Sequence, residues 1–212
     1  MAYELNIPTA ASILGGEVNP LIAEGYVAAQ KFAGLRPLRL HLGCGTVRFA
    51  EWVNVDMDGE PDLRLDLRYG LPFPDGCVDA IHSEHMLEHL SQADGRLLMS
   101  EAHRVLKPGG VVRIGVPDLA AIVRRYDSPD WRDQAWIADP NFDWIDTPVA
   151  LINVAFRGWE HQYLYDEGEL RRRLLAAGFT GVDRVEWGKS AHPEFAGLET
   201  RPETDLIVEA VK

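Results

Sequence analysis

Residues 83–90, with the sequence SEHMLEHL, place two histidines and two glutamates in one short stretch, directly after His82. His85, Glu88 and His89 match H-x-x-E-H, the zinc signature of the inverted metalloproteases. Such an enzyme needs this motif inside a long helix and a third ligand further along the chain. Residues 91–95, SQADG, would end a helix within about two turns. We therefore predict that no metal is bound. On the alternative interpretation, Leu87 and His89 pack inside the protein while Glu84 and His85 face a pocket.

The composition is that of an ordinary soluble globular protein. The 212 residues are 46% hydrophobic and 25% charged, so one domain with a substantial core is expected. The net charge of -12 argues against nucleic acid or an anionic membrane as the main partner. Cys44 and Cys77, the two cysteines, are too few for a disulfide scaffold. The N-terminus does not resemble a signal peptide, and no run of about 18 apolar residues occurs. We expect a cytoplasmic protein.

Strand and helix patterns alternate along the chain. Strands are predicted at residues 38–42, 52–55, 63–67, 78–81, 111–116, 182–187 and 206–211. Helices are predicted after Asn19, after Ser91, and after Asp166, which is followed by Glu169 in a capping box. This alternation is typical of a doubly wound α/β fold, with a mostly parallel sheet and helices on both faces. The connections between the first three predicted strands are short, so the helices expected there should be reduced to turns.

Ligands of such sheets bind at the carboxyl ends of the strands. The first strand ends at Gly43-Cys44-Gly45, where two glycines allow a sharp turn close to a ligand. A dinucleotide site would need a third glycine where Arg48 stands, so a nucleoside without phosphates suits the bend better. Asp56, at the end of the second strand, could accept hydrogen bonds from a ribose diol, and Asp66, at the end of the third, from an adenine amino group. His82 and Ser83 end the fourth strand and would lie beneath the same ligand.

These residues carry a resemblance to a known family. The chain resembles class I S-adenosylmethionine-dependent methyltransferases, closest to the broad bacterial group that contains the ubiquinone and menaquinone type. The matching segments are, in order, LHLGCG, NVD, LDL, LPFPDGCVDAI, SEHMLEHL and EAHRVLKPGGVVRIGVPD, within residues 38–116, followed more loosely by LYDEGELRRRLLAAGF and LIVEAVK. The resemblance implies a Rossmann-like sheet of seven strands with the last strand antiparallel. It also gives SEHMLEHL an ordinary place, because the family has x-x-x-L-E-H after its fourth strand.

The resemblance implies roles for several residues. Gly43, Cys44 and Gly45 would approach the methionine half of the cofactor, and Asp56 would bind its ribose. Met57 would pack on the adenine, with Asp66 and Leu67 at the adenine edge. His41 stands where the family usually has an acidic residue near the methionine amino group, and residues 46–55 are too few for the usual helical crossover. This shortened form is similar to predicted methyltransferases associated with surface-glycan and secondary metabolism.

Methyl transfer mainly requires that a nucleophile be aligned with the sulfonium, and a base helps when the acceptor is a hydroxyl. The candidate bases are His85 and His161, with Tyr163 or Tyr165 as positioning groups. His161 is also consistent with an ordinary surface or core histidine, the interpretation that the scarcity of catalytic side chains favours. The loop Lys189–Pro193 could reach the rim of the pocket or be a simple connection.

The chain is thus expected to form one methyltransferase domain over residues 1–212, with an N-terminal helical segment at 1–37. Residues 118–165 would be an insertion rich in aromatic residues that covers the substrate. Its tryptophans could line an acceptor site for a ring or a sugar, or simply form the insertion's own core. The predicted function is S-adenosylmethionine-dependent methylation of a small-molecule or saccharide acceptor, with oxygen as the expected methylated atom and S-adenosylhomocysteine as the product. Aminopropyl transfer and non-catalytic binding of S-adenosylmethionine are the alternatives.

Overall fold

A seven-stranded sheet forms the centre of the protein, in the order β3-β2-β1-β4-β5-β7-β6. The structure is a computed structural model, and it describes residues 20–212. The strands are β1 (Arg39–Leu42), β2 (Val53–Asp56), β3 (Leu63–Arg64), β4 (Val78–Glu84), β5 (Leu106–Val116), β6 (Thr180–Arg184) and β7 (Leu206–Val211). β7 is antiparallel to both β5 and β6, whereas the other pairs are parallel. The predicted doubly wound, mostly parallel sheet is therefore confirmed.

Three longer helices and three single turns connect or flank these strands in the described residues outside the segment that follows β5, and α4 begins that segment. They are α2 (Pro20–Ala29), η1 (Leu67–Tyr69), η2 (Leu87–His89), α3 (Gln92–Val105), α4 (Leu119–Tyr126), α6 (Glu167–Ala176) and η6 (Pro193–Phe195). Ser91 caps α3 by accepting from the Asp94 amide, and Asp166 caps α6 by accepting from the Glu169 amide at 2.7 Å. Asn19, the predicted cap of α2, lies outside the described residues.

Two strands differ in length from their predictions. β3 has only two residues, because Asp66 begins the turn η1 instead of continuing the strand. β5 begins at Leu106, so Lys107–Gly110, predicted to separate a helix from a strand, belong to the strand itself. Leu106 pairs with Val78 of β4, and the register then shifts before Ala80 pairs with Val111. A bulge of this kind lets glycines enter a strand.

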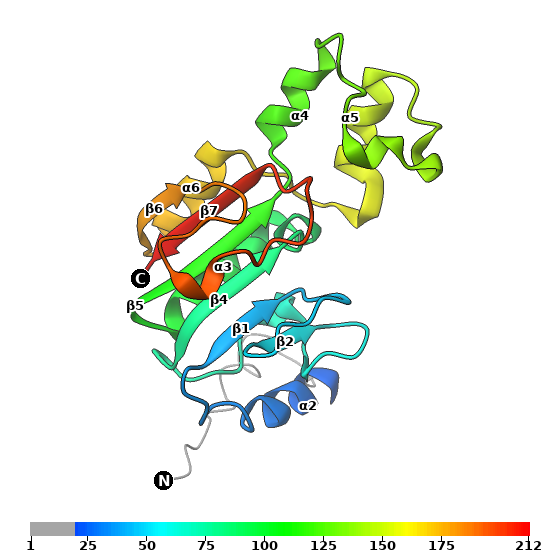
Figure 1. Ribbon diagram of the computed structural model, residues 1–212. Coiled ribbons are helices and arrows are strands. Elements are labelled where there is room, and N and C mark those ends of the chain that lie inside the picture. The colour runs from blue at the N-terminus through cyan, green and yellow to red at the C-terminus, as the bar shows by residue number, and fades with distance from the viewer. Residues whose placement is uncertain (1–19) are drawn as a thin grey trace.

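The two faces of the sheet are covered differently (Figure 1). Figure 1 shows α3 and α6 behind the sheet, and the connection between β6 and β7 in front of it. The large core lies on the helical face, where Leu40, Ile81 and Val112 meet residues of α3 and α6. The other face holds a smaller cluster around Trp52, Val111 and Phe195, with no helix longer than the turn η6 among the described residues there. The expected helices on this face are replaced by irregular connections.

Residues 118–165 leave the sheet after β5 and return to it before α6. Their ends lie side by side, because the Leu119 amide donates to the Tyr165 carbonyl at 2.9 Å. Between these ends, α4 is followed by η3 (Ala135–Ala138), η4 (Pro140–Phe142), α5 (Pro148–Arg157) and η5 (Gly158–Glu160). Figure 1 shows α4 and α5 projecting beyond the end of the sheet. We call residues 118–165 the insertion.

Within the part of the chain that the structure describes, no helix is both long enough and apolar enough to span a membrane.

Candidate active site

The Gly43–Gly45 bend is fixed to the end of β2 by backbone hydrogen bonds. The amides of Gly43 and Cys44 both donate to the Val55 carbonyl, at 2.9 and 3.1 Å. Gly43 and Gly45 have φ angles of 70° and 52°, in the left-handed region that glycine adopts without strain. The sequence Gly-Cys-Gly therefore turns the chain back over the end of the strand, as the two glycines predict.

Asp56 lies at the end of β2, directly against this bend. One carboxylate oxygen accepts from the Gly45 amide at 2.7 Å, and the other accepts from the amides of Met57 and Asp58 at 2.7 and 3.0 Å. The carboxylate is thereby fixed by three backbone donors next to the glycine bend. A carboxylate placed at the end of the second strand can accept hydrogen bonds from a ribose in folds of this kind.

The surroundings of the two glycines test whether a nucleoside cofactor fits here. At Gly45, no other described atom lies within 4 Å of the position that a Cβ would take, so a ligand can approach the backbone. At Gly43, by contrast, that position lies 2.2 Å from the Met86 side chain, which occupies the space that the missing side chain leaves. Met57 is 49% exposed beside Asp56 and offers an apolar surface. Gly45, Asp56 and Met57 therefore suit a bound nucleoside, and we call them the cofactor site.

Asn54 holds the short connection between β1 and β2 that supports the cofactor site. Its side-chain oxygen accepts from the Phe49 amide, and its side-chain nitrogen donates to the Phe49 and Trp52 carbonyls. The same nitrogen donates to Asp62 at 2.7 Å, and Arg48 binds Asp62 from the other side. Side-chain hydrogen bonds thus replace the missing crossover helix, and sequence reasoning did not find this role.

Asp66 and Leu67 are oriented by η1. The Asp66 carboxylate accepts from the backbone and the guanidinium of Arg68. Burial alone would raise the pKa of Asp66, but these bonds from Arg68 outweigh it and hold the pKa below its usual value. Leu67 is 7% exposed and packs in the large core. An adenine contact by Asp66 would therefore compete with Arg68.

Four other residues assigned to the cofactor from the sequence have buried side chains. His41 and His82 lie on neighbouring strands with their rings 5.3 Å apart, on the face covered by irregular connections. Ser83 points to the opposite face, towards α3. The Cys44 thiol is also buried, which raises its pKa. The burial of the three strand residues has a simple cause: side chains alternate along a strand, so residues near a strand end can point into the layers on either side of the sheet.

A cavity of about 600 Å³ lies between the end of the sheet and the insertion. Trp136, Phe142 and Trp159 form an aromatic wall on the insertion side, with ring centroids 5.3 to 5.6 Å apart. Arg125, Arg201, Glu203 and Asp205 supply charged groups. Trp136 and Phe142 also pack against the insertion's own core, so they line the cavity and stabilise the insertion at the same time.

Three histidines line this cavity: His85, His89 and His161. Both candidate bases therefore face the same space. The prediction that His89 packs in the core is wrong, and so is the prediction that Glu84 faces the pocket. Tyr163 and Tyr165, the predicted positioning groups, do not line the cavity. Tyr163 donates to Glu169, and Tyr165 is 2% exposed in the core, where burial raises its pKa to about 12.

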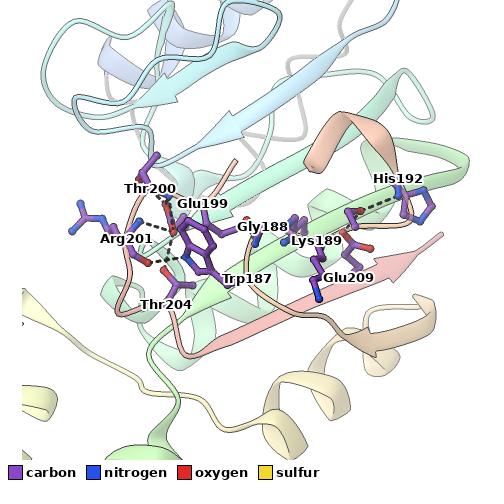
Figure 2. A network of polar contacts seen from close by, with 12 residues as sticks. Trp187, Gly188, Lys189, His192, Glu199, Thr200, Arg201, Thr204 and Glu209 are labelled. Atoms are coloured by element: carbon purple, nitrogen blue, oxygen red, sulfur yellow. Dashed lines mark hydrogen bonds and ion pairs between the residues drawn. The ribbon is translucent and has the colours of Figure 1, made fainter. Parts of the chain in front are cut away.

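Glu84 instead fixes the connection between β6 and β7, on which Figure 2 labels Glu199, Thr200 and Thr204. Its buried carboxylate accepts from the Thr200 amide and hydroxyl at 2.9 and 2.8 Å, and from the Thr204 hydroxyl at 2.7 Å. Fully buried Arg113 holds the same connection through Glu199 and the Lys189 carbonyl, and it also binds Glu209 of β7. These bonds bring residues 201–205 to the cavity. Residues Lys189–Pro193 lie against the sheet, where Ser190 donates to Glu209, and they do not line the cavity.

Known proteins support the assignment made from these residues. Residues 57–114 match the family described as Methyltransferase domain. A probable S-adenosylmethionine-dependent methyltransferase of Mycolicibacterium smegmatis is 37% identical over 70 residues, which is 31% of this chain and 26% of that protein. An uncharacterised transposon protein of Streptomyces fradiae is 38% identical over 69 residues, covering 32% of this chain and 19% of that protein. The matched segment thus spans about a quarter or less of these relatives.

Solved structures support the fold. A SAM-dependent methyltransferase of Archaeoglobus fulgidus aligns over 98% of this chain and 100% of its own, with 15% identity and a TM-score of 0.52. A possible histamine N-methyltransferase of Thermotoga maritima aligns over 91% and 90%, also with 15% identity, and a TM-score of 0.50. These structures show that the chain has the fold of S-adenosylmethionine-dependent methyltransferases, and the family match shows that residues 57–114 are also similar to such proteins in sequence.

Proposed function

We propose that the protein transfers a methyl group from S-adenosylmethionine to a hydroxyl of a small molecule or saccharide bound in the cavity. The observation that carries the proposal is the Asp56 carboxylate held on the Gly45 amide, with open space beside Gly45. The cofactor supplies an activated methyl group on its sulfonium. The protein's own contribution is then to orient the acceptor, which can lower the barrier by roughly 7–11 kcal/mol.

The aromatic wall supports an acceptor with a ring or a sugar face, because such rings stack on aromatic side chains and exclude water. The charged residues around it would orient polar groups of the same molecule. Because a filled pocket would favour binding without catalysis, the open cavity favours an enzyme. The net charge of -12 supports a small acceptor over nucleic acid, and we keep the cytoplasm as the proposed compartment.

His85 is the base that we propose. It follows β4 directly, lines the cavity, and has its ring between two groups: Nδ1 is 3.2 Å from a Glu88 oxygen, and Nε2 is 3.1 Å from the Thr204 hydroxyl. The hydrogen bond with Thr204 fixes the orientation of the ring, and a base so placed typically contributes about 10²–10⁴-fold. His161 faces the same cavity but belongs to a cluster with His89 and Glu88.

Binding of S-adenosylhomocysteine, measured by calorimetry, tests the cofactor site. Asp56→Ala should raise the Kd by about 10- to 100-fold, the usual loss for hydrogen bonds to a charged group. The matched control is Asp58→Ala, which removes an exposed carboxylate two residues away and should leave the Kd unchanged. Equal binding by both variants would remove Asp56 from the site. A panel of hydroxylated rings and saccharides, scored for labelled methyl uptake, then identifies the acceptor class.

A further inference from the structure

Glu88, His89 and His161 converge at the wall of the cavity, and one ligand atom of each lies within 4.8 Å of the others. They come from two segments: the turn η2 after β4, and the chain that follows η5 of the insertion. The Glu88 carbonyl accepts from the amides of Gln162 and Tyr163, at 2.8 and 3.1 Å. The Gln162 side chain also donates to the His89 carbonyl at 2.6 Å. These bonds hold the two segments together, so the convergence does not depend on flexible side chains alone.

Glu88 is fully buried, yet neither carboxylate oxygen has a hydrogen-bond partner among the described residues. His85 Nδ1 lies 3.2 Å from one oxygen, but the two groups do not meet hydrogen-bond geometry. A buried carboxylate without partners is strongly unfavourable unless a cation compensates it. The carboxylate therefore points to a cation that binds on the side of His89 and His161.

His161 is arranged as a neutral ligand. Its Nδ1 lies 2.7 Å from the Ala155 carbonyl, so Nδ1 carries the hydrogen and Nε2 keeps a free lone pair. The His89 ring lines the same cavity beside it. An imidazole that donates one nitrogen to a carbonyl and presents the other is typical of metal-binding histidines. The ring centroids are 5.0 Å apart, with the rings at 78° to each other.

The backbone around the cluster is strained. His85, Trp159 and Glu160, with φ angles of 50°, 51° and 63°, are the non-glycine residues with positive φ in the described chain. Such conformations persist only where the surrounding structure imposes them, and they concentrate at functional sites. Here they set the direction in which the chain enters η2 and leaves η5, and so position the two histidines.

We propose that Glu88, His89 and His161 bind one divalent transition-metal ion at the cavity wall. Two imidazoles and one carboxylate favour Zn²⁺, Fe²⁺ or Mn²⁺ over the all-oxygen ions Ca²⁺ and Mg²⁺. The sequence argument against a metal assumed that H-x-x-E-H must lie in a long helix. The structure does place Leu87–His89 in a single turn, but it brings a third ligand, His161, from 72 residues further along the chain.

His89 and His161 both line the cavity. An ion bound to them would therefore have its remaining coordination sites on the cavity side. A metal-bound hydroxyl loses its proton more readily than a free one. The ion would thus bind and activate the acceptor hydroxyl. This last step rests on the proposed function, whereas metal binding itself does not.

Co²⁺ is the probe for the test, because its visible absorption reports nitrogen and oxygen ligands. Chelator-treated protein should bind one Co²⁺ per chain in calorimetry, with new absorption bands. Glu88→Gln and His161→Ala should each raise the Kd for Co²⁺ at least tenfold and change the bands. His192→Ala, which removes a histidine outside the cavity, should bind Co²⁺ as the unmodified protein does. No Co²⁺ binding, or binding that both site variants leave unchanged, would overturn the proposal.

Two further measurements distinguish a loss of metal binding from misfolding and from a loss of cofactor binding. In metal-free protein, Glu88→Gln should unfold at the same temperature as the unmodified protein or above it, because it removes an uncompensated buried charge. A lower unfolding temperature would instead indicate a structural pair between Glu88 and His85 and would contradict the proposal. Binding of S-adenosylhomocysteine by chelator-treated protein should be retained, so a failed metal site and a failed cofactor site give different results.

Discussion

At the scale of single residues, polar side chains lie side by side across the face of the sheet that no long helix covers. Asn54, His41, His82, Arg113 and Glu209 occupy paired positions on five neighbouring strands. Most of them bind one another or nearby loops, but neither ring nitrogen of His82 has a hydrogen-bond partner in the described structure. Burial, together with His41 and Arg113 nearby, lowers the pKa of His82 well below its ordinary value. This histidine must stay neutral in the folded protein.

This gives a pH dependence of stability. The unfolded chain protonates His82 below about pH 6.5, but the folded protein does not, so the free energy of unfolding falls as the pH drops below that value. Each histidine that stays neutral in the folded protein lowers the free energy of unfolding by up to about 1.4 kcal/mol for every pH unit below that value. In urea unfolding at pH 7.5 and 5.5, His82→Leu should lose about 1 kcal/mol less between the two pH values than the unmodified protein. His41, whose pKa is also lowered by burial, supplies part of the remaining loss.

His192→Leu, at a half-buried position on the connection between β6 and β7, is the matched control and should keep the full loss. If His82→Leu lost as much stability on acidification as this control, the buried imidazole would not be the titrating group.

At the scale of elements, this chain builds a methyltransferase-like sheet with two of its connections shortened. Residues 46–52 and 57–62 contain no helix, and both are held by Asn54 with Asp62 and Arg48. Asn54 is 2% exposed, so its amide has no water to replace these partners. The Asn54 side-chain amide has four protein partners. Removing it should destabilise the protein by more than the loss of one average hydrogen bond, because each buried partner would then lack a hydrogen bond.

Asn54→Ala should therefore lower the free energy of unfolding by about 2–4 kcal/mol, as measured by urea unfolding. It should also weaken binding of S-adenosylhomocysteine, because the connection between β1 and β2 carries the glycine bend. Glu51→Ala is the control on the same connection: it removes an exposed ion pair with Arg39 and should change stability by less than about 1 kcal/mol. Similar losses for the two variants would show that Asn54 does not organise the connection.

At the scale of the whole molecule, the sheet was predictable and the cavity was not. The order LHLGCG, NVD, LDL predicted strands that end near one another, since consecutive parallel strands place their carboxyl ends at one edge. The confirmed contact between Asp56 and the glycine bend follows from that rule. The cavity, in contrast, joins His85 and His89 to His161 and to residues 201–205, which are far apart in the sequence. No local pattern signals such a meeting. Buried Glu84 and Arg113 hold the segment with residues 201–205, and the Glu88 carbonyl holds the segment with His161 through the Gln162 and Tyr163 amides.

The insertion and the sheet have separate cores, which predicts separate stabilities. Ile137, Ile145, Leu151 and Val154 form a cluster within the insertion, apart from the core beneath the sheet. The insertion's helices pack mainly on one another. A cavity made in one core should therefore loosen that unit first, because cooperative units can open below the global free energy of unfolding.

Ile145→Ala, at a position with no solvent exposure, should cost about 2–5 kcal/mol locally and speed hydrogen exchange in residues 131–157. Exchange in β4 and β5, and the Kd for S-adenosylhomocysteine, should stay unchanged, while acceptor methylation falls because the aromatic wall is no longer held in place. Ile81→Ala, an equally buried change beneath the sheet, should instead speed exchange in β4 and β5. If Ile145→Ala sped hydrogen exchange in β4 and β5 as much as in residues 131–157, the two cores would unfold as one. The insertion could then not open independently of the sheet.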